Sequence, residues 1–173
     1  MISQVSSTRN KLIGFVWIFV FSFILWLALS STLDPQELIC GVLVCLIISL
    51  FAAHIYSKLG FPSLSLKIVL FSLIYIVVLF WEIIKANFDI AYRVIHPKMP
   101  IKPGIVAIKT SLKSDLAKMI LANSITLTPG TLTVDVIDDK LLIHWINVKA
   151  EDIDGATSLI GEKFEKYLRV IFS

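Results

Sequence analysis

The chain has few charged residues. Asp, Glu, Lys and Arg make up 17% of its 173 residues, and 57% are hydrophobic, whereas about 25% of the residues in a typical soluble protein are charged. No charged residue occurs from Leu12 to Leu33 or from Leu38 to Ser57. Each run is about as long as the roughly 20 residues that cross a bilayer. We therefore exclude an ordinary soluble domain and interpret the chain as an integral membrane protein.

The chain also lacks the residue patterns of common catalytic and metal sites. Its two cysteines, Cys40 and Cys45, point about 140° apart on a helix and have no nearby histidine to complete a zinc site. We interpret both as small packing residues. No nucleophile elbow, Walker loop, dinucleotide fingerprint or metal-binding histidine pair occurs. The sequence thus predicts no enzyme, no catalytic residue, no metal and no cofactor, and it has no nucleic-acid-binding motif.

The first apolar run has one alternative interpretation, a cleaved secretory signal, because Arg9 and Lys11 precede it. However, the run is longer than the usual 7–15 residues of a signal core. No small-x-small cleavage site precedes the next apolar segment either. We therefore favour a membrane helix.

A third apolar segment runs from Ile68 to Trp81 and is followed by charged residues. Its uncharged core of about 14 residues would also fit an interfacial or re-entrant helix, but it is apolar on every face, which favours a third membrane helix. The predicted organisation is an N-terminal tail (1–11), a membrane region (12–96) with helices at about 12–33, 38–57 and 64–95, a proline-rich linker (97–103) and a cytoplasmic α/β domain (104–173).

The placement of charge leaves the orientation of the membrane helices open. The loop around Asp34 and Glu37 has no Lys or Arg and is therefore expected outside the cell. Two crossings followed by a shallow third helix satisfy every basic residue. Three crossings with the amino terminus outside expose four basic residues, but they also place the tail inside. Both arrangements put residues 104–173 in the cytoplasm.

Charged residues form one stripe on the helix that continues beyond Trp81. Glu82, Lys85, Asp89 and Arg93 follow the spacing i, i+3, i+7, i+11, with alternating sign. We favour a salt-bridged face where the helix leaves the lipid. The alternative is an ion or proton relay, since ionisable residues near a membrane are candidates for one. Glu82 and Lys85 are accordingly the possible intramembrane or interfacial polar residues.

Residues 104–173 predict a small α/β domain with the order β-α-β-β-α. Strands are expected at 104–110, 131–136 and 141–148, with a hairpin turn at Asp138–Lys140. An amphipathic helix follows from Leu112 to Ile120, and a terminal helix carries an apolar stripe from Ile160 to Ile171. The predicted fold class is therefore a membrane α-helical anchor of two to three transmembrane helices followed by this domain.

A threonine-rich turn lies inside this domain. Pro129 and Gly130 suit the second and third positions of a type II turn, because proline fixes φ and glycine tolerates positive φ. The residues serve either as a well-made turn or as a rigid, hydroxyl-rich loop presented to a partner. The candidate partner-docking residues are Asn123, Thr126, Thr128, Pro129, Gly130 and Thr131.

The stretch from Leu121 to Val136 resembles the hallmark of the E-type component of multi-subunit Na⁺/H⁺ antiporters of the Mrp or Mnh type. The resemblance extends from about residue 12 to 172 and includes Trp81–Asn87, Pro103–Val106 and Ile143–Trp145. It implies an accessory subunit in the plasma membrane of a bacterium, within a complex that exchanges Na⁺ for H⁺. It also implies that the partners are the other subunits and membrane lipids, and that the large subunits hold the principal proton-translocating residues.

The residues by themselves leave a second function open. A membrane-anchored adaptor or regulatory domain, binding a soluble partner or anionic lipid, would have the same composition and the same kind of small tail. A subunit of a complex is expected to be unstable or inactive when it is expressed alone, and an adaptor is not.

Overall fold

The computed structural model describes residues 2–59, 65–150 and 152–172, which fall into two units, residues 1–63 and 64–173. The first unit is a helical hairpin, and the second combines a long helix with an α/β domain. Each unit is described by itself.

The helical hairpin consists of α1 (Ile2–Ser30) and α2 (Pro35–Leu59). Ser31 turns the chain with a φ of 52°, and Pro35 takes the first position of α2, where its missing N–H costs no hydrogen bond. Helix α1 begins ahead of the expected start at Leu12, because apolar composition marks contact with lipid and not the end of a helix. The side chains of residues 1–11, 13 and 53–64, which include Arg9 and Lys11, lie outside the described residues.

Small residues form the contact between the two helices of the hairpin. Gly41, Cys45 and Ser49, spaced four residues apart on α2, are buried. A Cβ atom on Gly41 would lie 2.6 Å from the indole of Trp26, so glycine permits the close approach. Cys45 is thus a small packing residue, as predicted. Cys40 is exposed, and both cysteines are free.

Two of the described helices have the length and apolar composition needed to cross a membrane. They are residues Pro35–Ala52 of α2 and the whole of α3 (Leu66–Ile95). The segment Gly14–Ser30 of α1 is apolar but shorter. The apolar helices predicted from the sequence are therefore present.

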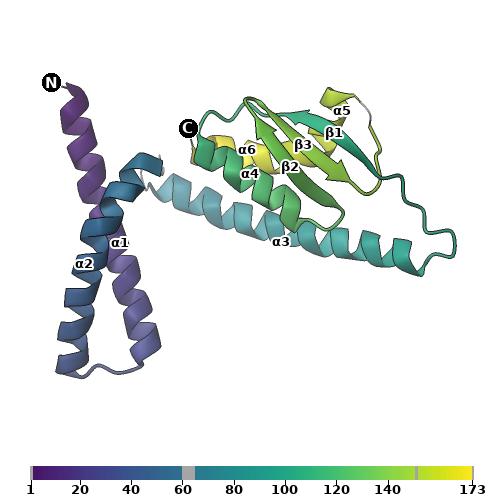
Figure 1. Ribbon diagram of the computed structural model, residues 1–173. Coiled ribbons are helices and arrows are strands. Elements are labelled where there is room, and N and C mark those ends of the chain that lie inside the picture. Colours follow the sequence, from purple (N-terminus) through teal and green to yellow (C-terminus); the bar gives the residue numbers. More distant parts are fainter. Residues whose placement is uncertain (1, 60–64, 151, 173) are drawn as a thin grey trace. The chain divides into compact units, whose positions relative to one another are not determined.

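The second unit places a three-stranded antiparallel sheet on a layer of helices (Figure 1). Its sheet order is β1-β3-β2. After α3 the elements are β1 (Gly104–Lys109), α4 (Asp115–Leu127), β2 (Thr131–Ile137), β3 (Lys140–Trp145), α5 (Ile153–Ala156), the π-helical turn η1 (Thr157–Gly161) and α6 (Glu162–Ile171).

One face of the sheet forms the core with α4, η1 and α6. Val106 pairs with Ile143 and Ile108 with Leu141, and all four side chains are buried on this face. Phe164 of α6 is fully buried against them. The opposite face of the sheet carries exposed residues, including Ile105 and His144.

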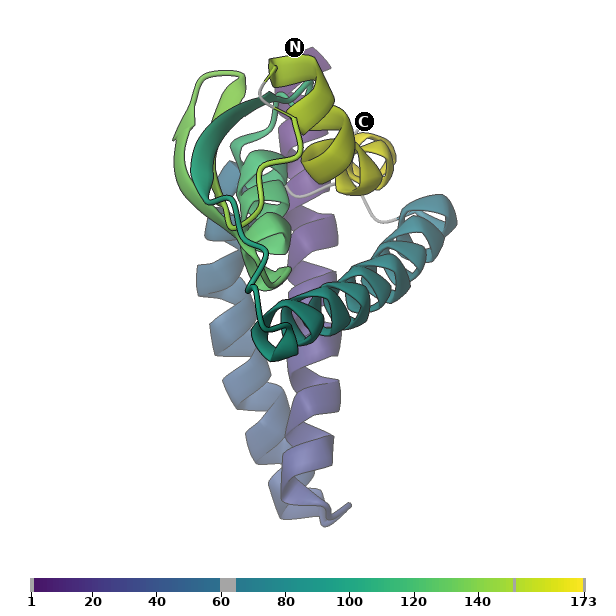
Figure 2. The ribbon, with the colours of Figure 1, turned by 90° about the vertical axis from the view of Figure 1, so that its right-hand side faces the viewer.

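Helix α3 belongs structurally with the α/β domain and runs along it in both views (Figures 1 and 2). Tyr75 is part of the domain core, and Ile68, Phe71 and Leu79 pack against that core. The sequence predicts this helix as part of the membrane region, because apolar composition does not distinguish a protein-facing side from a lipid-facing one. Its all-round apolar character has a structural cause, since one side packs on the domain.

Candidate functional site

A pocket of about 290 Å³ lies where α3 meets the threonine-rich turn and α6. It brings together five of the eight candidate docking and polar residues named from the sequence, from segments far apart in the chain: Glu82, Lys85, Thr128, Pro129 and Thr131. Asn123 and Thr126 are exposed and do not line it. The remaining lining comes from Ala86, Asp89, Ile125, Trp145, Lys149, Leu159, Ile160, Lys163 and Phe164.

The turn that borders the pocket has the predicted geometry. The amide of Thr131 donates to the carbonyl oxygen of Thr128 at 3.2 Å, which closes a four-residue turn. Gly130 has a φ of 92°, the positive value that a type II turn requires at its third position. The positive φ predicted for Gly130 is therefore confirmed.

The threonine hydroxyls around the turn bond to the chain's own backbone. The last carbonyls of a helix have no partner within the helix, and three of these hydroxyls donate to carbonyls in the C-terminal half of α4. The bonds are Thr128 Oγ1 to Ser124 O (2.8 Å), Thr131 Oγ1 to Ile125 O (2.7 Å) and Thr133 Oγ1 to Ala122 O (3.0 Å), while Thr126 Oγ1 accepts from the amide of Thr133 (3.1 Å). The hydroxyls thus hold α4, the turn and β2 together.

The turn also rests directly on α3. A Cβ atom on Gly130 would lie 3.2 Å from Cδ1 of Ile90 and 3.0 Å from Cγ2 of Ile146. Glycine is therefore needed here for its close approach to α3 as well as for its backbone angle. The turn at Pro129 and Gly130 therefore joins the α/β domain to α3.

A buried hydrogen bond makes a second link between α3 and α4. The hydroxyl of Tyr75 bonds to Oγ of Ser124, which itself donates to the carbonyl of Ile120 at 2.8 Å. Tyr75 and Ser124 are 7% and 2% exposed, so water does not replace this bond readily.

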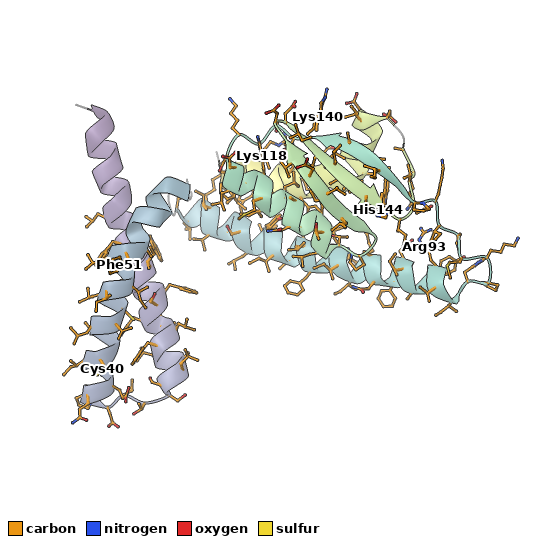
Figure 3. All side chains as sticks on the ribbon, viewed as in Figure 1. Cys40, Phe51, Arg93, Lys118, Lys140 and His144 are labelled. Atoms are coloured by element: carbon orange, nitrogen blue, oxygen red, sulfur yellow. The ribbon has the colours of Figure 1, made fainter. Side chains whose placement is uncertain are left out.

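The charged stripe on α3 forms the ion pairs that its spacing predicted. Nζ of Lys85 lies 2.6 Å from Glu82, and Nε of Arg93 lies 2.7 Å from Asp89. Arg93, labelled in Figure 3, also donates to the carbonyl of Pro100 and so fixes the segment that follows the helix.

The stripe has one further partner that the sequence did not predict. Lys163 of α6 places Nζ 2.8 Å from the second carboxylate oxygen of Glu82, whose side chain is only 12% exposed. The two residues are far apart in the sequence, and no local spacing relates them. The sequence shows only that Lys163 lies beside Phe164, at the edge of the apolar stripe of the terminal helix. This position does not identify Glu82 as its partner unless the fold is known.

The pocket presents paired charges beside an apolar floor. Among the described residues, no three His, Cys, Asp or Glu side chains gather closely enough to hold a metal ion. The Glu82 carboxylate already has two cationic partners, and Lys149 adds a third ammonium group to the lining.

Comparison with known proteins gives one consistent family. A family model described as "Na+/H+ ion antiporter subunit" matches residues 19–171. The E1 component of the Na⁺/H⁺ antiporter of Staphylococcus haemolyticus is 32% identical over 94% of each chain. The E component of the Na⁺/H⁺ antiporter of Alkalihalophilus pseudofirmus is 32% identical over 86% of this chain and 89% of its own length.

A solved structure is more similar still. One chain of the membrane-bound sulfane sulfur reductase, an archaeal respiratory membrane complex, is 51% identical to this chain with a TM-score of 0.80. The match covers 92% of this chain and 99% of that one.

Proposed function

The chain belongs to the Na⁺/H⁺ ion antiporter subunit family, and from this premise we propose that it is an accessory subunit of a multi-subunit cation/proton antiporter. The resemblance to the E-type component found in the sequence is confirmed. In the proposed role the subunit contributes to assembly and cation export and does not transport ions alone. The observation that carries the proposal is the family match over residues 19–171.

The distribution of charge supports an accessory role over an independent transporter. The apolar runs 12–33 and 38–57 contain no Asp, Glu, Lys or Arg, whereas transport paths through membranes are typically marked by ionisable residues. Glu82 faces Lys163 of the α/β domain and is held in ion pairs. We assign it a structural role in place of a relay, and we assign the chain no catalytic activity.

The threonine-rich turn has an internal role in this proposal. It holds the α/β domain on α3 through its backbone bonds and through the contact of Gly130 with Ile90. The pocket beside it, with Pro129 and Lys149 on its lining, is then the place where a companion subunit docks. We treat α5, η1 and α6 as one terminal helical element, which makes the domain a β-α-β-β-α unit.

We place the α/β domain on the cytoplasmic side. The loop around Asp34 and Glu37 carries no basic residue, while Lys67 lies in the first turn of α3 and Lys98 and Lys102 follow the end of this helix. Basic residues concentrate on the cytoplasmic side of membrane proteins. This assignment puts the pocket within reach of cytoplasmic parts of companion subunits.

A second candidate function is the same subunit built into a respiratory complex. The 51% identity to a chain of the sulfane sulfur reductase complex exceeds the 32% identity to the antiporter subunits. Affinity purification of the full chain from its native membranes distinguishes the two. If the chain belongs to a respiratory complex, redox subunits co-purify with it. If it belongs to an antiporter, antiporter subunits co-purify without redox subunits.

Deletion of the gene within its operon tests the proposed function. We expect loss of Na⁺-dependent dequenching of a pH dye in everted vesicles, and restoration by the wild-type gene. Thr128→Ala and Pro129→Gly are expected to restore less activity and less assembled complex than Cys40→Ala. Antiport and assembly that survive the deletion would refute the proposal, and equal restoration by all three variants would refute the role of the turn.

A further inference from the structure

Helix α3 has two apolar sides with different neighbours. Its inner side contacts the α/β domain over most of its length, from Ile68 through Tyr75 and Glu82 to Ile90. These contacts span about 33 Å at 1.5 Å per residue. Their spacing of seven or eight residues, about two helical turns, places them on one continuous helix face.

The outer side of α3 is a long exposed apolar surface, which we call the outer face. Leu73, Val77, Phe80, Ile84 and Phe88 lie along it and are 47% to 74% exposed. They recur at intervals of three and four residues, so they form one stripe opposite the domain-facing side. The complete set of exposed large apolar residues on α3 is Leu66, Val69, Leu70, Leu73, Ile74, Ile76, Val77, Phe80, Trp81, Ile84, Phe88, Tyr92, Val94 and Ile95.

The polar groups next to the outer face are arranged as a bilayer surface requires. The side-chain amide of Asn87, a polar residue within this stripe, donates to the carbonyl of Ile83 at 2.8 Å. Lys67 and Lys85 are exposed and lie five helical turns apart, hence on the same flank of the helix. Trp81 and Tyr92 are exposed aromatic residues of the kind enriched at membrane interfaces.

The chain itself brings α3 to the membrane. Helix α3 starts at Leu66, and the apolar helix α2 ends at Leu59. An extended chain spans at most about 3.6 Å per residue, so the connection cannot carry α3 far from the point where α2 leaves the lipid.

From these observations we propose that α3 lies flat in the surface of the lipid bilayer, with its outer face among the acyl chains and the α/β domain mounted on its other side. Lys67 then meets lipid phosphates at one edge. The chain crosses the membrane with α1 and α2 only. This inference concerns the membrane and does not depend on which complex contains the protein.

A transmembrane α3 is incompatible with these contacts. If α3 crossed the bilayer, α6 would be carried into the hydrocarbon with it, because Lys163 and Phe164 of α6 pack along the middle of α3. Lys166 and Arg169 of α6 are exposed and would face lipid. Charged groups in the hydrocarbon core are strongly disfavoured. Helix α3 is therefore long enough to cross the bilayer but does not cross it.

Cysteine labelling in membranes that contain the whole complex tests this topology. In a Cys40→Ala/Cys45→Ala background, Lys67→Cys and Lys98→Cys mark the two ends of α3, and Asp138→Cys marks the α/β domain. We expect an impermeant maleimide to label all three positions from the same side of the membrane. Labelling of positions 67 and 98 from opposite sides would overturn the proposal.

Photocrosslinking identifies what covers the outer face. A benzophenone amino acid is placed at Phe80 or Phe88 in the assembled complex. We expect most of the crosslinked copies to carry a lipid adduct and not a protein adduct. The matched control is Leu132 on the open side of the sheet, 50% exposed, where lipid adducts should be at least tenfold fewer. Adducts at Phe80 to a companion subunit, or no lipid adduct, would overturn the proposal.

Discussion

Ser124→Ala should destabilise the α/β domain through a group that the substitution does not touch, the hydroxyl of Tyr75. This hydroxyl bonds to Ser124 Oγ inside the core, where Tyr75 is 7% exposed. Removing the serine leaves a buried donor without its partner, which costs about 1–3 kcal/mol. For a unit of this size, about 1 kcal/mol lowers the thermal midpoint by roughly 4 °C.

Tyr75→Phe should cost less, although it removes the same hydrogen bond. Oγ of Ser124 keeps its bond to the carbonyl of Ile120 at 2.8 Å, so no polar group is stranded. We expect a loss of about 0.5–1.5 kcal/mol, the net value of a typical hydrogen bond.

The double variant Ser124→Ala/Tyr75→Phe separates the two effects. Because it removes both partners, it should be more stable than Ser124→Ala alone. The assay is thermal unfolding of the full chain in detergent. Hydrogen exchange of the backbone amides of α4 measures the local loss of stability. A double variant less stable than Ser124→Ala would refute the reasoning, since the cost would then come from packing and not from a stranded hydroxyl.

Two further pairs of substitutions test how the domain is held on α3. Gly130→Ala should cost about 1–3 kcal/mol, because alanine is strained at a φ of 92°. The control is Gly104→Ala, whose Cβ would lie 3.0 Å from Val148, as close as a Cβ on Gly130 would lie to Ile146, and which should cost less than half of that. Equal losses of thermal midpoint would contradict the role of the backbone angle. Lys85→Met should cost less than about 0.5 kcal/mol, because exposed ion pairs contribute little to stability. Lys163→Met should cost more, about 1 kcal/mol, because Lys163 is the less exposed of the two partners of Glu82. Urea unfolding at low salt measures both losses, and the reverse order would contradict the assignment.

Much of the fold follows from local sequence signals. The apolar runs give the helices of the hairpin, and Pro129 with Gly130 gives the turn at its correct place. The stripe from Ile160 to Ile171 marks the buried side of the terminal helix, in which Ile160, Phe164, Leu168 and Ile171 are buried. These features depend on spacing along a single element, which the sequence displays directly.

The assignment of α3 could not be made in the same way. Ile68 and Val77 have similar hydrophobicity, yet Ile68 packs on the core and Val77 is 68% exposed. Hydrophobicity measures transfer from water and does not specify the apolar medium that receives the side chain. The ion pair of Glu82 with Lys163 was hidden for a related reason, because it depends on where α6 lies and not on sequence spacing.

The dependence of α3 on α6 has a consequence for biosynthesis. The ribosome makes α3 well before α6, so the inner side of α3 leaves the exit tunnel before Phe164 and Lys163 exist to cover it. During that interval the nascent chain presents a 30-residue helix that contains an 18-residue stretch with a mean hydropathy of 2.3, which meets the usual requirement for membrane insertion. The insertion machinery therefore encounters this segment in a form that the mature protein does not have, and its final position is determined only when the carboxyl-terminal helix has been synthesised and folds onto it.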